Sequence, residues 1–206
     1  MIIPVIVPGG MFTKSPSSLT ASPDESKVKA FRGVFEQSLL DIANNTGGVS
    51  NIKERCIILS GGVDTCAIMA ATKKLGIKFG VALTVVTSDE SPDLGFSSAC
   101  AAEHGVEHHV VRLTADELVD EYLPDTIELL KRYDGMTIRN SLVIAAVFKK
   151  AKQLGFEYAV VGDGADELFG GYSFSWKQKD AKLWKEKRDA MCDKWTFSTD
   201  ELGKEK

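Results

Sequence analysis

Short apolar runs alternate with helix-like segments along most of this chain, and the connections between them are short. Four runs are compatible with buried strands, at residues 56–60, 79–86, 109–113 and 158–161. Segments with apolar residues at helical spacing follow the first three runs, and Gly76, Gly105 and Gly155 mark helix ends. Parallel strands need such crossovers, so the pattern predicts an α/β fold: a parallel sheet with helices on both faces.

Composition narrows the class of protein. The chain has 206 residues, 26% of them charged, and a net charge of −4, which suits one globular domain and indicates neither a nucleic-acid surface nor a membrane surface. No apolar run approaches the roughly 18 residues of a membrane helix. Four scattered cysteines form no CxxC pair, and the apolar neighbours of Cys56 and Cys66 favour core positions for both. We expect a cytoplasmic protein in a reducing compartment.

The N-terminal segment lacks the pattern of the rest. Residues 9–27 are rich in Ser, Thr, Pro and Gly and show no apolar periodicity. Helical spacing begins at Val28 and continues to Ile42. We therefore expect a flexible tail or linker over residues 1–27 and one folded domain over residues 28–206.

The first candidate motif is SGGVDT, residues 60–65, which directly follows an apolar run. Its two glycines allow a tight turn that brings backbone N–H groups close to an anion, and Ser60 and Thr65 supply hydroxyl donors. Asp64 would tolerate a bound phosphate only with a cation such as Mg²⁺ between them. The motif lacks the lysine of a Walker loop. A purely structural turn stays open as an alternative.

The second motif, GDGADELFGGY at residues 162–172, is more specific. Asp163, Asp166 and Glu167 place three carboxylates within five residues, where their repulsion calls for a cation. A helix-capping acidic turn is the alternative. If the strand order reverses beside the first strand, as in doubly wound sheets, the two motifs share one crevice.

With these motifs, and with SPDL at 91–94 and YDGMTIRNS at 133–141, the chain resembles the synthetase domain of the asparagine synthetase family from about residue 30 to 206. That family belongs to the PP-loop ATP pyrophosphatases. The resemblance implies an adenine nucleotide alpha hydrolase-like (PP-loop/HUP-like) fold. It also implies a ligase that adenylates the β-carboxylate of aspartate with ATP and Mg²⁺, releases pyrophosphate, and lets ammonia displace AMP.

The resemblance also implies roles for particular residues. Pyrophosphate would be held by Ser60, Gly61, Gly62, Asp64 and Thr65. Magnesium would be bound by Asp64 and Asp166. The AMP site would be lined by Leu59, Val86, Val161 and Gly162. The amino-acid substrate would be handled by Thr137 and Arg139, since an arginine can grip a carboxylate with two hydrogen bonds.

The chain departs from the family in three respects. Met1 is followed by Ile2 rather than by a cysteine nucleophile with its glutaminase domain, so the source of ammonia is open: free ammonia, a separate glutaminase chain, or a longer protein. Relative to the family, we expect the domain to be C-terminally incomplete after Lys206. Asp163 replaces the family's usual glutamate, which acts in forming the acyl-adenylate. Because it is shorter by one methylene, we expect weak or no turnover.

Two other functions compete with a ligase. The first is a catalytically impaired ATP- and Mg²⁺-binding subunit or regulator with the same fold. The second is a PP-loop enzyme that modifies tRNA, against which the acidic net charge and the lack of CxxC pairs speak. The oligomeric state, a homodimer included, stays open.

Overall fold

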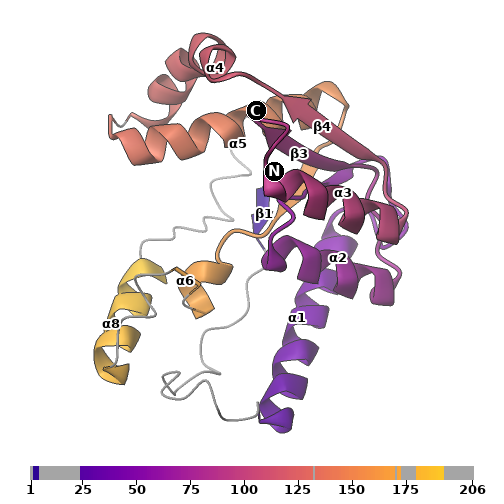
Figure 1. The fold of residues 1–206 in the computed structure, drawn as a ribbon. Helices are drawn as coiled ribbons and strands as arrows, with labels where there is room; N and C mark the ends of the chain where they lie inside the picture. The colour runs from indigo at the N-terminus through magenta and orange to yellow at the C-terminus, as the bar shows by residue number, and fades with distance from the viewer. Residues whose placement is uncertain (1, 5–23, 132, 170, 173–179, 193–206) are drawn as a thin grey trace.

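The computed structural model describes residues 2–4, 24–131, 133–169, 171–172 and 180–192. Five strands form one sheet in the order β1-β5-β2-β3-β4, and all pairs are parallel (Figure 1). The strands are β1 (Ile2–Pro4), β2 (Arg55–Ile58), β3 (Ala82–Val86), β4 (His108–Arg112) and β5 (Tyr158–Val161). The predicted reversal is confirmed, because β5 pairs directly with β2, with Cys56 opposite Ala159.

Strand β1 differs from the tail that the sequence indicated over residues 1–27. Ile3 lies opposite Val160, so this short segment pairs with the outer edge of β5. A segment of three residues that ends in a proline carries no periodic signal, whereas in the fold it can pair with the backbone groups of an edge strand. The first helix also begins earlier than Val28, at Glu25, because Asp24 caps it by accepting from the N–H groups of Ser26 and Lys27. Residues 5–23 lie outside the described part.

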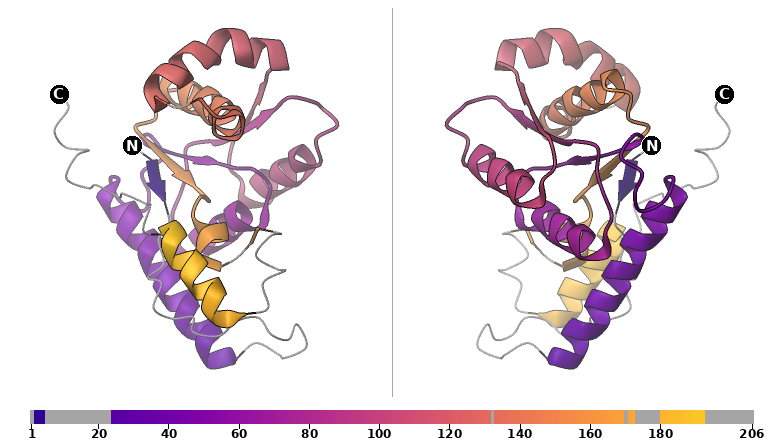
Figure 2. Two further views of the ribbon diagram at one scale, coloured as in Figure 1. Left: turned by 90° about the vertical axis from the view of Figure 1, so that its left-hand side faces the viewer. Right: turned by 90° about the vertical axis from the view of Figure 1, so that its right-hand side faces the viewer.

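Helices cover both faces of the sheet, as predicted (Figures 1 and 2). One face carries α1 (Glu25–Asn45), α2 (Val63–Leu75) and α3 (Pro92–His104). The other carries α4 (Ala115–Leu130) and α5 (Gly135–Gln153). Two shorter helices follow β5, namely α6 (Ala165–Phe169) and α8 (Ala181–Cys192), and they contact each other.

The core divides by the alternation of side chains along the strands. Ile57 and Val160 face the helices α1 to α3 and pack with Leu39 and Met69. Their neighbours along the strands face α5 instead, in a second cluster made of Cys56, Val81, Leu83, Val147, Ala151 and Ala159. Strands β2, β3 and β5 are therefore buried on both sides, which explains why they read as continuous apolar runs.

Local signals place the helix ends. Thr114 and Glu117 form the predicted capping box at the start of α4, with each side chain bonded to the other's backbone N–H. Gly76 and Gly105 end α2 and α3 in the left-handed conformation, at φ of 70° and 64°. None of the helices in the described ranges is both long and apolar enough to cross a membrane.

Arg55, the first residue of β2, is wholly buried at the amino edge of the sheet. Its guanidinium donates to neutral oxygens, namely the carbonyls of Ala43, Gly48, Val49 and Lys78 and the hydroxyl of Thr46. It also lies over the ring of Phe79, 5.8 Å from the centroid. Arg55 thereby joins the end of α1 to the loops before β2 and β3.

Candidate active site

The two sequence motifs meet at the carboxyl edge of the sheet. Because β2 and β5 are adjacent and parallel, the segments that follow them emerge side by side. Together with α5 they enclose a cavity of about 270 Å³. Its lining consists of Ile58, Ser60, Asp64, Thr65, Ile144, Val147, Phe148, Val161, Gly162, Asp163, Gly164, Asp166, Glu167 and Tyr172.

Gly162 is where the two motifs come closest. A Cβ atom added there would lie 2.9 Å from Thr65 Cγ2 and 3.3 Å from Asp64 Cβ. Any side chain at position 162 would therefore push the first motif away from β5.

The first motif forms a tight turn into α2. Ser60 Oγ lies 3.1 Å from Thr65 Oγ1 and accepts from the N–H of Gly62 at 3.2 Å. Gly61 has φ of 80°, and a Cβ there would lie 2.7 Å from the carbonyl oxygen of Asp93 on α3, so glycine is required for two reasons.

The start of α2 adds a positive end to this cavity. Its N-cap is Gly62, which supplies no side-chain acceptor to the first-turn N–H groups. Those groups and the helix dipole favour an anion at this end of the helix. Ser60 and Thr65 add hydroxyl donors beside it, so the first motif is suited to hold phosphate oxygens.

The second motif gives the cavity a strongly negative side. Burial raises the pKa of Asp64, and the negative charges of Asp166 and Glu167 raise it further. The pKa of Asp163 is raised by burial and then by Glu167. These shifts place carboxylates of both motifs within electrostatic reach of one another, in surroundings that penalise their charge.

Tyr172 closes the acidic cluster. Its hydroxyl donates to Glu167 Oε1 at 2.5 Å. Burial, that hydrogen bond and the three carboxylates beside it hold the pKa of Tyr172 above its usual range, so the phenol keeps its proton. Tyr172 therefore acts as a hydrogen-bond donor within the acidic cluster.

The residues present fit a magnesium ion shared with a ligand. In the part of the chain that the structure describes, no three His, Cys, Asp or Glu side chains are grouped so as to hold a metal by themselves. Magnesium is commonly bound by only one or two carboxylates, together with waters and substrate phosphates. Burial and the nearby charge of Asp166 disfavour the charged form of Asp64, and a divalent cation between the carboxylates and a phosphate would relieve this.

An apolar wall faces these polar groups. It comes from Ile144, Val147 and Phe148 on α5, together with Ile58 and Val161 at the ends of β2 and β5. Sequence reasoning missed the three α5 residues. Nothing in the sequence marks them, since the exposure of Ile144, at 40%, is visible only in the structure.

Most of the motif residues assigned from the sequence line this cavity: Ser60, Asp64, Thr65, Val161, Gly162, Asp163 and Asp166. Gly61 and Gly62 shape the turn behind it, and Leu59 is wholly buried beneath. Gly164, Glu167 and Tyr172 of the second motif also line the cavity. Sequence reasoning counted Glu167 among the three carboxylates that call for a cation but assigned no specific role to Gly164 or Tyr172.

Besides Leu59, Gly61 and Gly62, three further assigned residues lie outside this lining. Val86 lines a neighbouring cavity of about 280 Å³ at the ends of β3 and β4, beside the ion pair of Arg112 and Asp89. Thr137 and Arg139 lie in the first turns of α5, where Thr137 is half-buried and Arg139 exposed.

Comparison with known proteins identifies the domain. The family model described as asparagine synthase matches residues 52–203. Asparagine synthetase B (glutamine-hydrolysing) of Escherichia coli strain K12 is 32% identical over 143 residues, which cover 61% of this chain and 25% of the relative. The glutamine-hydrolysing asparagine synthetase of Asparagus officinalis is 33% identical over 126 residues, or 57% of this chain and 21% of the relative.

Among solved structures, the glutamine-dependent NAD⁺ synthetase of Acinetobacter baumannii, in complex with ADP, covers 75% of this chain and 28% of that chain, with a TM-score of 0.49 and 15% identity. This chain thus spans about a quarter or less of the length of the two curated relatives described above. The match to the family model covers both motifs and most of the folded domain. The chain belongs to the asparagine synthase family.

Proposed function

We propose that this domain is an ATP-dependent amide-forming ligase. It activates the β-carboxylate of aspartate, or a similar carboxylate, as an acyl-adenylate with release of pyrophosphate, and ammonia then displaces AMP. The asparagine synthetases that match this chain are the first support for this activity. The second is the arrangement of the site itself.

The observation that carries the proposal is the meeting of the two motifs in one cavity. The uncapped start of α2, with Ser60 and Thr65, suits the oxygens of a polyphosphate. The carboxylates of Asp64 and Asp166 stand close enough to raise the pKa of Asp64. An anion-binding turn and an acidic cluster are compatible in one cavity when a divalent cation bridges them.

Magnesium would be held by Asp64 and Asp166, and when bound it would neutralise charge on the phosphates. The other groups act directly on the nucleotide. Ser60 and Thr65 orient the phosphate oxygens, the apolar wall around Phe148 excludes water, and Val161 and Gly162 face the AMP portion.

Exchange of labelled pyrophosphate into ATP tests the activation step. The exchange should require both aspartate and Mg²⁺, and ammonia should then yield asparagine and AMP. Replacing aspartate with glutamate in the assay tests the choice of carboxylate. Exchange that is independent of any added carboxylate would contradict a ligase.

A binding-only subunit is the second candidate, and Asp163 favours it. A carboxylate shorter by one methylene places its oxygens about 1 Å from where a glutamate would hold them, and such an error can cost about 100-fold in rate. Asp163→Glu should then raise pyrophosphate exchange by about 10-fold or more. Both forms should bind Mg²⁺-ATP equally, which separates impaired catalysis from lost binding. No gain in exchange would exclude side-chain length at this position as the cause of weak turnover.

The partners follow from the chemistry. The nitrogen donor is ammonia, either free or delivered by a glutaminase domain or a separate glutaminase chain, and the proposed setting is the cytoplasm. A titration of ammonium against glutamine in the synthesis assay distinguishes the donors. Sedimentation of the purified chain tests for a homodimer.

A further inference from the structure

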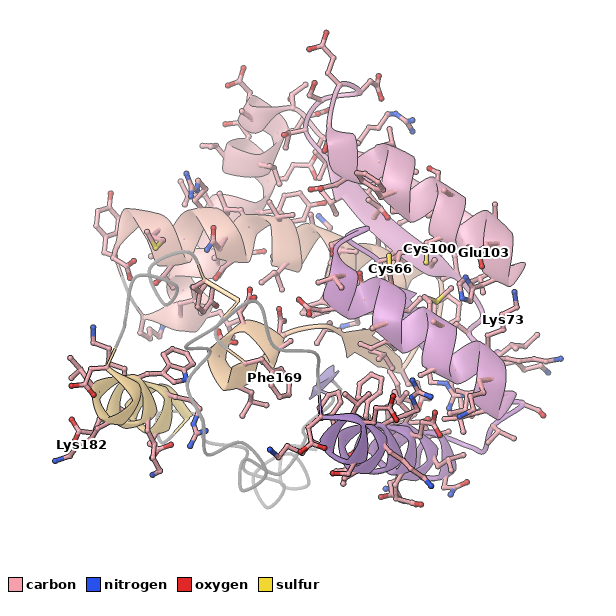
Figure 3. All side chains as sticks on the ribbon, turned by 60° about the horizontal axis from the view of Figure 1, so that its bottom comes forward. Cys66, Lys73, Cys100, Glu103, Phe169 and Lys182 are labelled. Atoms are coloured by element: carbon pink, nitrogen blue, oxygen red, sulfur yellow. The ribbon has the colours of Figure 1, made fainter. Side chains whose placement is uncertain are left out.

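Two cysteine side chains from different helices meet behind the first motif. Cys66 lies in the first turns of α2 and Cys100 lies on α3, and Cys66 is close enough to contribute to the raised pKa of the Cys100 thiol. Figure 3 shows the two labelled side chains projecting toward one another between the helices. Cys66 is half-buried rather than a fully enclosed core residue, whereas Cys100 is buried.

The surroundings of the pair leave both sulfurs able to react with each other. Cys66 Sγ lies 3.5 Å from the carbonyl oxygen of Gly61, and Cys100 Sγ lies 3.9 Å from His104 Nδ1. His104 Nδ1 lies 2.8 Å from the carbonyl oxygen of Cys100. Because the two side chains point toward one another from helices that contact each other, side-chain rotation can bring the sulfurs to the separation of a disulfide bond.

Cys56 provides an internal contrast. It lies on the opposite face of the sheet, in the cluster with Val147 and Ala151, and is wholly buried. Its thiol lies 3.5 Å from the carbonyl oxygen of Tyr158. Burial raises its pKa to about 12, so it should stay an unreactive thiol.

We propose that Cys66 and Cys100 are a redox-active dithiol that forms a reversible disulfide between α2 and α3. With hydrogen peroxide as the oxidant, the Cys66 thiol is converted to a sulfenic acid and one water is released. The Cys100 sulfur then attacks the Cys66 sulfur, the S–S bond forms, and the hydroxyl leaves with the Cys100 proton as a second water. Two thiols are oxidised and one peroxide is reduced, and a dithiol reductant reverses the change.

Exposure sets the order of the two steps. The half-buried Cys66 is the sulfur that a small oxidant can reach from solvent. Burial and the contact with Cys66 raise the pKa of Cys100 to about 11, so Cys100 remains a thiol until the sulfenic acid forms beside it. Cys66 therefore reacts first, and Cys100 resolves the sulfenic acid.

The bond would join α2 to α3 directly behind the first motif, whose Gly61 already packs against α3. It closes a loop of about 35 residues, which removes conformational freedom from the unfolded chain. Oxidation should therefore raise the melting temperature, by about 5–10 °C for a chain of this size.

The test treats the reduced, folded chain with hydrogen peroxide, alkylates the remaining thiols and maps peptides without reduction. We expect one crosslinked peptide pair containing Cys66 and Cys100, the loss of two free thiols per chain, and the rise in melting temperature, all reversed by dithiothreitol. Cys56→Ser is the matched control and should retain the crosslink and the rise. Neither readout involves nucleotide, so the outcome is independent of the proposed ligase activity.

A second variant separates the two sulfurs. In Cys100→Ser, peroxide should leave Cys66 as a sulfenic acid that dimedone traps, with no crosslink and no rise in melting temperature. Cys66→Ser should show neither crosslink nor trapped sulfenic acid at Cys100. A crosslink to any other cysteine, a bond between chains, or unchanged alkylation of Cys66 after peroxide would overturn the proposal.

Discussion

The two edges of the sheet differ in how their charged side chains are stabilised. At the amino edge, the wholly buried Arg55 donates to a ring of neutral carbonyl oxygens and one hydroxyl. At the carboxyl edge, burial and then the negative charges of Asp166 and Glu167 raise the pKa of Asp64. The chain itself supplies the hydrogen-bond acceptors that Arg55 needs, whereas the carboxylates at the carboxyl edge would be stabilised by a bound cation.

This contrast assigns stability to one edge and function to the other. Hydrogen bonds that hold a buried cation stabilise the fold whether or not a ligand is present. Carboxylates that repel one another cost stability until a ligand arrives, which is typical of functional sites. Substitutions at the two edges should therefore have opposite signatures in stability and in activity.

The largest expected effect is at the amino edge. Arg55→Ala would remove every hydrogen bond that the guanidinium donates to these carbonyls and to Thr46, together with its packing against Phe79. We expect the free energy of unfolding to fall by about 3 kcal/mol or more. Urea denaturation measures it, and Lys53→Ala, an exposed neighbour, should stay within about 0.5 kcal/mol of wild type. A loss for Arg55→Ala as small as that of Lys53→Ala would break the contrast.

Asp64→Asn, at the carboxyl edge, should lose activity while gaining stability. Pyrophosphate exchange should fall by about 100-fold, since a proposed cation ligand is lost. In EDTA the melting temperature should rise by about 2 °C, because the folded state no longer holds a disfavoured charge. Asp120→Asn, on the exposed surface of α4, is the control and should change neither quantity.

The dependence of stability on pH should reveal the same unfavourable charge on Asp64. A carboxyl whose pKa is raised by folding binds its proton more tightly in the folded state, so its contribution to stability grows as pH falls toward the raised pKa. Wild type should gain stability relative to Asp64→Asn as the pH is lowered from 7 toward about 4, the ordinary pKa of an aspartate. If plots of stability against pH ran parallel for the two proteins, folding would not raise the pKa of Asp64.

How much of the structure the sequence predicts depends on whether the interactions join residues that are close or distant in the sequence. Local signals succeeded: Tyr158–Val161 is confirmed as β5, and the capping box of Thr114 and Glu117 is present. The apolar wall of the site was missed, because Ile144 and Phe148 reach the cavity only through the packing of α5 across the sheet. The resemblance to the family supplied Thr137 and Arg139, and the structure sets both apart from the cavity lining.

A smaller effect should follow from Gly162→Ala. Its Cβ would press on Thr65 and Asp64 and separate the two motifs. Overpacking of this kind typically costs about 1–3 kcal/mol, so the affinity for Mg²⁺-ATP should fall by about tenfold. Gly95→Ala on α3 is the matched control: a Cβ there meets nothing within 4 Å, and the variant should bind as wild type does. Equal binding by both variants would mean that the motifs need not touch.

The smallest expected effect is that of Tyr172→Phe. It removes the hydroxyl that donates to Glu167 but keeps the ring. Losing one hydrogen bond to a carboxylate should weaken Mg²⁺-dependent binding of ATP by about three- to tenfold. Tyr133→Phe, at an exposed phenol, should have no effect on the same titration. Tighter binding in Tyr172→Phe would show that the hydroxyl competes with the cation for Glu167.

Calorimetric titration of ATP, with and without Mg²⁺, into wild type, Asp64→Asn and Asp166→Asn tests the central claim most directly. One shared site predicts Mg²⁺-dependent binding of one ATP per chain, weakened to a similar extent in either variant and weak without the metal in all three. Binding that needs no metal, or that survives the loss of both carboxylates unchanged, would mean that the two motifs do not form the nucleotide site.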